Sequence, residues 1–420
     1  MKRKTSIRLE LPYLYIITVF FLTFNAVKFW PIPGAITIAS GIGIVLPFFI
    51  CRSFFKTNQF GYFLLYAVVV FLNHMLGDKY FSNTNSLFSG FIGFFVALPL
   101  TYYVFKNREY TLLRVIIYTL MVVLLWTTVA TAFFDWQFPG LVRMVYSEAS
   151  RGEGDLSYSN YLYAWGLSSY TLPHALPLLI PAFVLGIKNR SLEKRKRFLS
   201  GLMLLCCLGL TYFSGATGPV LVAIMILFMS LLLRKGDITT NIARLFSIAI
   251  IITPFIISDQ FALMGLEWVD GLIGGEGYFH NKIMDFQYSI LYDESSGSLE
   301  ARVGLLGSSL DVFFDNPLNF LIGAKDGYGG HSALLDRLAS LGIVGFIPFV
   351  CLLIVQFRFV SKYLVLQYRA YYFLGLFAAF MMMVSKNVSG WYIWFCLFTV
   401  LPFCIYFYSD TEDTVIRRKV

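Results

Sequence analysis

Long apolar stretches dominate the chain, and short segments between them hold most of the charged residues. A helix needs about 20 mostly apolar residues to cross a bilayer. The chain offers twelve candidates, at 11–29, 31–50, 60–77, 87–105, 111–134, 161–187, 198–213, 217–233, 241–259, 342–360, 370–386 and 391–408. We therefore expect an all-α integral membrane protein with about 12 transmembrane helices. The first stretch follows a basic segment like that of a signal peptide, but no small-residue cleavage site follows it, so we expect an uncleaved span.

The composition supports a membrane protein over a soluble one. Of 420 residues, 58% are hydrophobic and 14% are charged, whereas soluble domains carry about 25% charged residues. This excludes a disordered protein, a soluble two-domain enzyme and a disulfide-stapled secreted module.

The charges also predict an orientation. With both termini inside, the cytoplasmic face holds 24 of the 33 Lys and Arg residues and 7 of the 24 acids. The external face then holds 9 cations and 17 acids. This is the distribution expected from the positive-inside rule. The net charge of +9 therefore indicates attraction to anionic membrane lipid, and we expect no nucleic-acid partner.

Loop lengths divide the chain into four parts. We expect a nine-helix transmembrane portion over 1–259 with an external loop at 135–160, and a large periplasmic loop over 260–341. A three-helix portion over 342–408 and a cytoplasmic tail over 409–420 follow. Loops this long are often functional, so the chemistry is expected at the external face.

The large loop contains an amphipathic helix over 299–314. Its apolar stripe follows the helical period, through Leu299, Val303, Leu306, Leu310 and Phe313. Ser298 is a candidate N-cap, and Pro317 is expected to stop the helix. Arg302 lies at the edge of the stripe, where its guanidinium can reach a ligand at the membrane surface. The alternative is a helix that only anchors the loop to the surface.

A second short helix is predicted over 332–341, after the glycine-rich turn 326–330. Its expected apolar face consists of Leu334, Leu335, Leu338 and Leu341. Ser332 as N-cap places His331 at the helix N-terminus, where the helix dipole disfavours an imidazolium. A neutral imidazole can accept a proton. The alternative is a solvent-exposed histidine with no chemical role.

Four arginines on the otherwise acidic external face are candidate phosphate ligands: Arg143, Arg151, Arg302 and Arg337. A planar guanidinium makes bidentate contacts with phosphate oxygens. Glu153 and Asp155 have the spacing of a metal-binding acid pair, but we interpret them as solvated loop charges and expect no metal site.

Residues 300–345 contain an ordered set of motif residues: Glu300-Ala301-Arg302, Asp315-Asn316-Pro317-Leu318, Gly323, Gly327, Gly329, His331, Leu334, Leu335, Leu338, Gly342 and Gly345. This ordered set resembles the O-antigen polymerase and ligase superfamily. The twelve-span plan, with its long external loop before span ten, extends the resemblance to the whole chain. Arg151-Gly152 and Asn160 are similar to the other external arginine segment of the family.

The resemblance implies a membrane glycosyltransferase whose donor is a glycan on undecaprenyl diphosphate. A polymerase transfers the growing glycan to another lipid-linked repeat unit, and a ligase transfers it to the lipid A core. The ligase branch usually has an arginine soon after the serine that ends span seven. Here Ser214 is followed by Gly215-Ala216-Thr217-Gly218, which favours the polymerase.

In this interpretation the active site faces the periplasm of a bacterial inner membrane, and the reaction needs no metal or other cofactor. His331 is the candidate base for the acceptor hydroxyl. Arg302 and Arg151 are expected to hold the diphosphate, with Arg143 and Arg337 as further candidates. The implied partners are the undecaprenyl-diphosphate-linked oligosaccharide and membrane lipid. A protein that regulates the length of the glycan chain is a further possible partner.

Three other classes remain open. A transporter or flippase for lipid-linked sugars fits twelve spans equally well, although such carriers usually show two related halves and charges at the midplane. A metal-dependent sugar transferase would use Glu153 and Asp155, and EDTA would inhibit it. A non-catalytic assembly partner would tolerate loss of Arg302 or His331.

Overall fold

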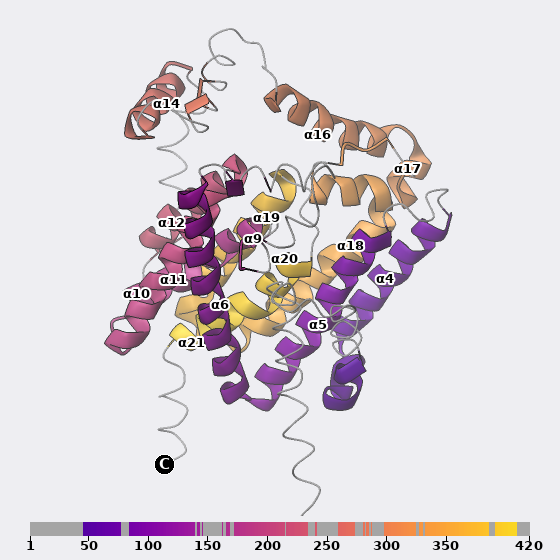
Figure 1. Ribbon diagram of the computed structural model, residues 1–420. Helices are drawn as coiled ribbons and strands as arrows, with labels where there is room; N and C mark the ends of the chain where they lie inside the picture. The colour runs from indigo at the N-terminus through magenta and orange to yellow at the C-terminus, as the bar shows by residue number, and fades with distance from the viewer. Residues whose placement is uncertain are drawn as a thin grey trace, which may run out of the picture.

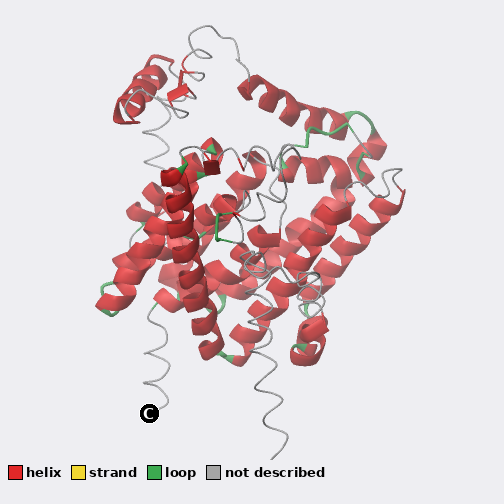
Figure 2. Ribbon diagram, in the orientation of Figure 1, coloured by secondary structure: helices red, strands yellow, loops and turns green. Residues whose placement is uncertain are grey.

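The computed structural model describes residues 45–76, 84–138, 141–142, 145, 162, 165–168, 172–214, 216–233, 240–241, 259–273, 280–281, 283–284, 287, 298–324, 327–330, 332–385 and 391–409. Within these ranges every regular element is helical (Figure 2). The predicted span 11–29, most of 31–50 and nearly all of 241–259 lie outside the described residues.

Helices occur where the apolar stretches predict them. Six helices lie within a few residues of predicted spans: α4 (Asn58–Leu76), α5 (Thr84–Asn107), α6 (Tyr110–Gln137), α11 (Lys194–Phe213), α12 (Thr217–Leu232) and α19 (Arg369–Ser385). A seventh, α18 (Ala333–Ser361), contains the predicted span 342–360 and begins nine residues earlier. Among the described residues, four helical segments are long and apolar enough to cross a membrane: Tyr110–Gln137, Lys194–Phe213, Ala333–Ser361 and Leu366–Ser385. By helix length and hydropathy, the chain is thus a candidate multi-pass membrane protein.

Exposed apolar side chains cover the outer surface of the bundle. On α6, Val122 is 68% exposed and Val129 is 58% exposed, and Trp136 near its C-terminal end is 75% exposed. Soluble proteins rarely expose contiguous apolar surface of this kind. Such a surface is compatible with a lipid environment.

The predicted span 161–187 is not one helix over its described part. It contains α9 (Leu172–Ala175), the 3-10 turn η2 (Leu176–Leu178) and α10 (Ile180–Lys188). Pro173, Pro177 and Pro181 explain the breaks, because each lacks an N–H donor and its ring opposes the preceding helical turn.

The segment 391–408 changes its helical period. It runs through α20 (Trp391–Phe395), the π-helical turn η4 (Cys396–Val400) and α21 (Leu401–Tyr408). Pro402 cannot donate to the carbonyl of Phe398, four residues earlier. The hydroxyl of Thr101 on α5 donates to that carbonyl instead, at 2.7 Å. A neighbouring helix thus satisfies the acceptor that proline leaves unpaired, as the membrane interior requires.

One end of the bundle gathers several helix ends. The side-chain amide of Asn189 donates to the carbonyl of Tyr408 at 2.8 Å, and Lys188 Nζ donates to the carbonyl of Leu231 at 2.6 Å. The rings of Tyr110 and Tyr406 stack with centroids 5.1 Å apart. We call this the basic end, because the described residues near it include Arg52, Lys56, Lys106, Arg108, Lys188, Arg190, Lys194, Arg195, Lys196, Arg197, Arg358, Lys362 and Arg369.

The opposite end carries the helices of the large loop. Figure 1 shows α14 (Asp259–Ile273), α16 (Ser298–Phe314) and α17 (Pro317–Ile322) beyond the bundle at this end, with α14 well separated from α16. The predicted helix 299–314 is confirmed as α16. Pro317 does not only stop it: Asn316 caps α17 by accepting from the Asn319 amide at 2.8 Å, and Pro317 opens that helix.

The buried face of α16 agrees with the predicted stripe only in part. The stripe residue Phe313 is 4% exposed, whereas the stripe residue Leu310 is 38% exposed and Ser309, which lies outside the stripe, is 1% exposed. Ser309 is buried because it faces a polar partner on α18, described below. On the first part of α18, the predicted face residue Leu341 is buried, together with Ala333, Asp336 and Ala339. The other predicted face residues, Leu334, Leu335 and Leu338, are only half-buried.

Gly342 interrupts α18. Its backbone has φ +58°, and a Cβ there would lie 2.5 Å from backbone atoms of Gly323 and Leu321. Only glycine fits this conformation and this close approach. The amide of Ala324 donates to the carbonyl of Ala339 at 2.7 Å, supplying the bond that the interrupted helix does not. The predicted short helix 332–341 is therefore a separate half-helix before the long apolar part of α18.

Candidate functional site

The structure describes one of the five predicted site residues fully, one by its backbone alone, and the other three not at all. Arg302 lies in the first turns of α16, and its side chain is outside the described residues. Arg337 is described fully, on the half-helix before Gly342. His331, Arg143 and Arg151 lie outside the described residues, although both neighbours of His331 are described.

The glycine-rich turn before His331 packs directly on α16. A Cβ on Gly329 would lie 1.9 Å from the carbonyl oxygen of Leu305, so no larger residue fits without movement of one backbone. Leu305 is three residues after Arg302, just under one helical turn. The fold thus brings the helix that carries Arg302 against the chain that leads to His331.

A buried carboxyl group joins these segments. Asp336 is 6% exposed. Its Oδ1 accepts from the hydroxyl of Ser309 at 2.8 Å and from the amide of Gly330 at 3.2 Å. Its Oδ2 accepts from the amide of Ser332 at 3.1 Å. The Ser309 hydroxyl in turn accepts from the amide of Gly329 at 3.0 Å. We call Ser309, Gly329, Gly330, Ser332 and Asp336 the carboxyl network.

The predicted cap of the half-helix is confirmed. The hydroxyl of Ser332 accepts from the amide of Leu335 at 3.2 Å, and the backbone of Ser332 is extended. The same hydroxyl donates to the carbonyl of Met383 on α19 at 3.2 Å. The helix start that follows His331 is therefore fixed both locally and against the bundle.

Arg337 lies among aromatic side chains. The centre of its guanidinium is 5.2 Å from the ring centroids of both Phe349 and Trp394, within the range of a cation–π contact. Its Nε donates to the hydroxyl of Tyr66 at 3.2 Å, and Nη1 donates to the carbonyl of Ala333 at 3.1 Å. Arg337 thus ties α18 to α4 and α20, and Nη2 has no acceptor among the described residues.

A histidine–aspartate pair lies near α14, where the sequence pattern assigned no role. Nδ1 of His280 is 2.7 Å from Oδ1 of Asp270, and their side chains are 26% and 19% exposed. An aspartate oxygen at this distance fixes the orientation of an imidazole ring. A spacing of ten residues carries no motif, so only the structure reveals the pair.

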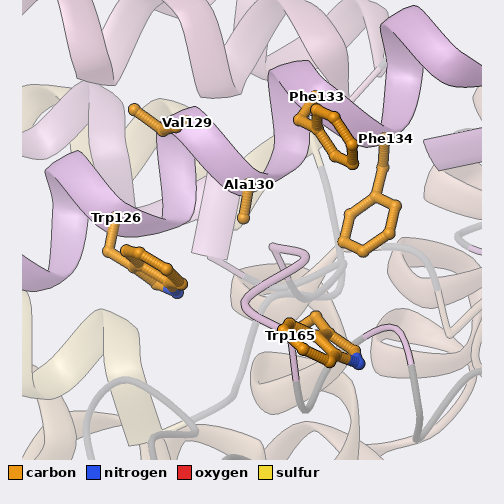
Figure 3. Close-up of a pocket in the computed structure, with 6 residues that line it drawn as sticks. All are labelled: Trp126, Val129, Ala130, Phe133, Phe134 and Trp165. Carbon is orange, nitrogen blue, oxygen red and sulfur yellow. The ribbon is translucent and has the colours of Figure 1, made fainter.

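An apolar groove runs along α6 and holds no ionisable side chain. It encloses about 410 Å³ and is lined by Trp126, Val129, Ala130, Phe133, Phe134 and Trp165. Figure 3 shows Trp165 facing α6 from a separate segment. The amide of Ser168 donates to the hydroxyl of Thr131 at 3.1 Å and holds that segment in place. The lining of the groove is suited to an apolar ligand chain, whereas the polar groups described above belong to the carboxyl network.

Comparison with protein-family models finds no match, and comparison with curated proteins finds none. The function is therefore argued from the residues and the geometry.

Proposed function

We propose that the protein polymerises lipid-diphosphate-linked oligosaccharide repeat units at the external face of a bacterial inner membrane, by metal-independent glycosyl transfer. The observation that carries the proposal is the docking of the Gly329 turn on α16. It brings the backbone of the Arg302 helix against the chain around His331, and these residues are the candidate phosphate ligand and base.

The charge distribution supports the orientation. The positive-inside rule assigns the basic end of the bundle to the cytoplasm. The opposite end, with α16 and α17, would then face the periplasm (Figure 1). We extend this to a twelve-span protein with both termini inside.

The proposed reaction is one displacement at the anomeric carbon of the donor. The acceptor hydroxyl oxygen forms a bond to that carbon as the bond to the diphosphate oxygen breaks. His331 accepts the hydroxyl proton. Arg302 and Arg151, with Arg143 and Arg337 as further ligands, stabilise the negative charge on the departing lipid diphosphate. The displacement inverts the anomeric configuration.

Purified protein in lipid tests the proposal. Synthetic undecaprenyl-diphosphate-linked repeat unit is added with EDTA, and product lengths are measured by mass spectrometry. A ladder of repeat units is expected. No ladder contradicts a polymerase. Single transfer to an added lipid A core would then indicate a ligase, and exchange of lipid-linked sugar between leaflets without transfer would indicate a transporter.

The EDTA distinguishes the proposed reaction from that of a metal-dependent sugar transferase. A ladder that forms only when divalent metal replaces EDTA would contradict the metal-independent reaction. The candidate metal ligands would then be Glu153 and Asp155, which lie outside the described residues.

A further inference from the structure

We infer that Asp336 is a positioning residue, which holds the backbone on both sides of His331 against α16. This inference rests on the proposed function, because its consequence for catalysis acts through His331. It adds a residue that the sequence pattern did not single out: Asp336 is predicted there only as part of a short helix.

The backbone contacts carry the inference. The amides of Gly330 and Ser332 immediately precede and follow His331, and each donates to a different oxygen of Asp336, at 3.2 and 3.1 Å. Two hydrogen bonds from one carboxyl group therefore span the residue between them. The amide of Asp336 also donates to the carbonyl of Ser332 at 2.8 Å, which fixes the carboxyl group relative to the helix start.

The carboxyl network also binds the segment around His331 to α16. Ser309 on α16 donates to Asp336 at 2.8 Å while accepting from Gly329 at 3.0 Å. Ser309 is 1% exposed, so these bonds are shielded from water. Asp336 thus sets the position of the His331 segment relative to the helix that carries Arg302, and not only its local conformation.

Asp336→Asn is the direct test, because it keeps the size of the side chain. One carboxyl oxygen becomes an amide donor that opposes an N–H or hydroxyl donor. Hydrogen exchange followed by mass spectrometry should show faster exchange at residues 329–332. In the ladder assay, kcat should fall by about 100-fold, as expected for misplacement of a reacting group. The KM for the lipid-linked repeat unit should stay close to that of the unmodified protein.

Two further variants make the result specific. Ser309→Ala removes one hydrogen bond to the carboxyl group and the acceptor of the Gly329 amide, but it leaves the amides of Gly330 and Ser332 bonded to Asp336. Its loss of kcat should therefore be smaller. It also provides the test if Asp336→Asn does not fold. Asp311→Asn is the matched control, because Asp311 is an exposed residue of the same helix α16. It should change neither the exchange nor the kcat.

Unchanged exchange in Asp336→Asn would overturn the inference, and so would faster exchange with unchanged kcat. An equal loss of activity in Asp311→Asn would also overturn it. Failure of the proposed function gives a different result, because the unmodified protein would then form no ladder at all. In that case the catalytic consequence inferred for Asp336 would be rejected too.

Discussion

Gly329 lies against the carbonyl oxygen of Leu305, so closely that a Cβ on Gly329 would stand 1.9 Å from that oxygen. These residues are 24 positions apart and belong to the glycine-rich turn and to α16. Their contact packs the chain before His331 directly on the helix that carries Arg302.

Gly329→Ala should therefore impair the proposed transfer. The added methyl group must push the turn away from α16, and we expect a loss of kcat of at least tenfold, since small misplacements at a reacting centre have large effects. The rate of ladder growth measures this. Gly304→Ala is the control, because a Cβ at Gly304 on α16 meets no atom within 4 Å. Equal losses in the two variants would contradict a role for the contact.

The interruption of α18 makes a prediction about stability. Gly342→Ala adds a Cβ at φ +58°, where it would lie 2.5 Å from the backbone of Gly323. We expect destabilisation by more than about 1 kcal/mol, because the backbone conformation is strained and α17 is displaced. Thermal unfolding in detergent, followed by tryptophan fluorescence, measures the change. Gly61→Ala on α4, where a Cβ meets nothing within 4 Å, should leave the melting temperature unchanged or raise it.

Arg337→Lys tests whether a planar guanidinium is needed at its position. Lysine keeps the charge, but it cannot stack between Phe349 and Trp394 while donating to Tyr66. Because the proposed reaction uses Arg337 as a further diphosphate ligand, KM for the donor should rise while the folded protein is retained. A lower melting temperature with unchanged KM would instead give Arg337 a purely structural role between α4, α18 and α20.

A buried amide pair connects α4 and α18 close to the basic end. Gln59 Nε2 donates to Gln356 Oε1 at 2.5 Å, and the residues are 3% and 0% exposed. Changing either one to leucine leaves the other amide buried without this partner, and should cost about 1–3 kcal/mol.

The double variant Gln59→Leu/Gln356→Leu should cost less than the sum of the two single changes. Measured couplings of this kind between membrane helices average about 0.6 kcal/mol. The comparison uses reversible unfolding of all four proteins. Strict additivity would show that the two amides do not stabilise the helix pair together.

The sequence predicts much of the helical fold, because the relevant signals are local. Apolar stretches locate α4, α6 and α11 to within a few residues, and Ser332 is recognised as a cap from its place before an apolar run. The prolines of 172–188 indicate that the helix is interrupted there, but their spacing does not predict where each helical segment begins.

The site is less predictable, because its contacts are long-range. Ser309 and Asp336 are 27 residues apart, and neither stands out by residue type. Their pairing buries Ser309 beside the predicted stripe and leaves the stripe residue Leu310 exposed, which periodicity alone cannot detect. The π-helical turn before Pro402 similarly depends on Thr101, which comes from a distant helix.

The base assignment is the central chemical claim, and His331→Ala tests it most directly. Unmodified protein and variant, matched in amount and melting temperature, are given the lipid-diphosphate-linked repeat unit with EDTA, and product lengths are measured by mass spectrometry. His280→Ala is the matched control, because His280 pairs with Asp270 near α14, away from α16 (Figure 1). We predict a ladder from the unmodified protein and from His280→Ala, and none from His331→Ala. A normal ladder from His331→Ala would contradict the account.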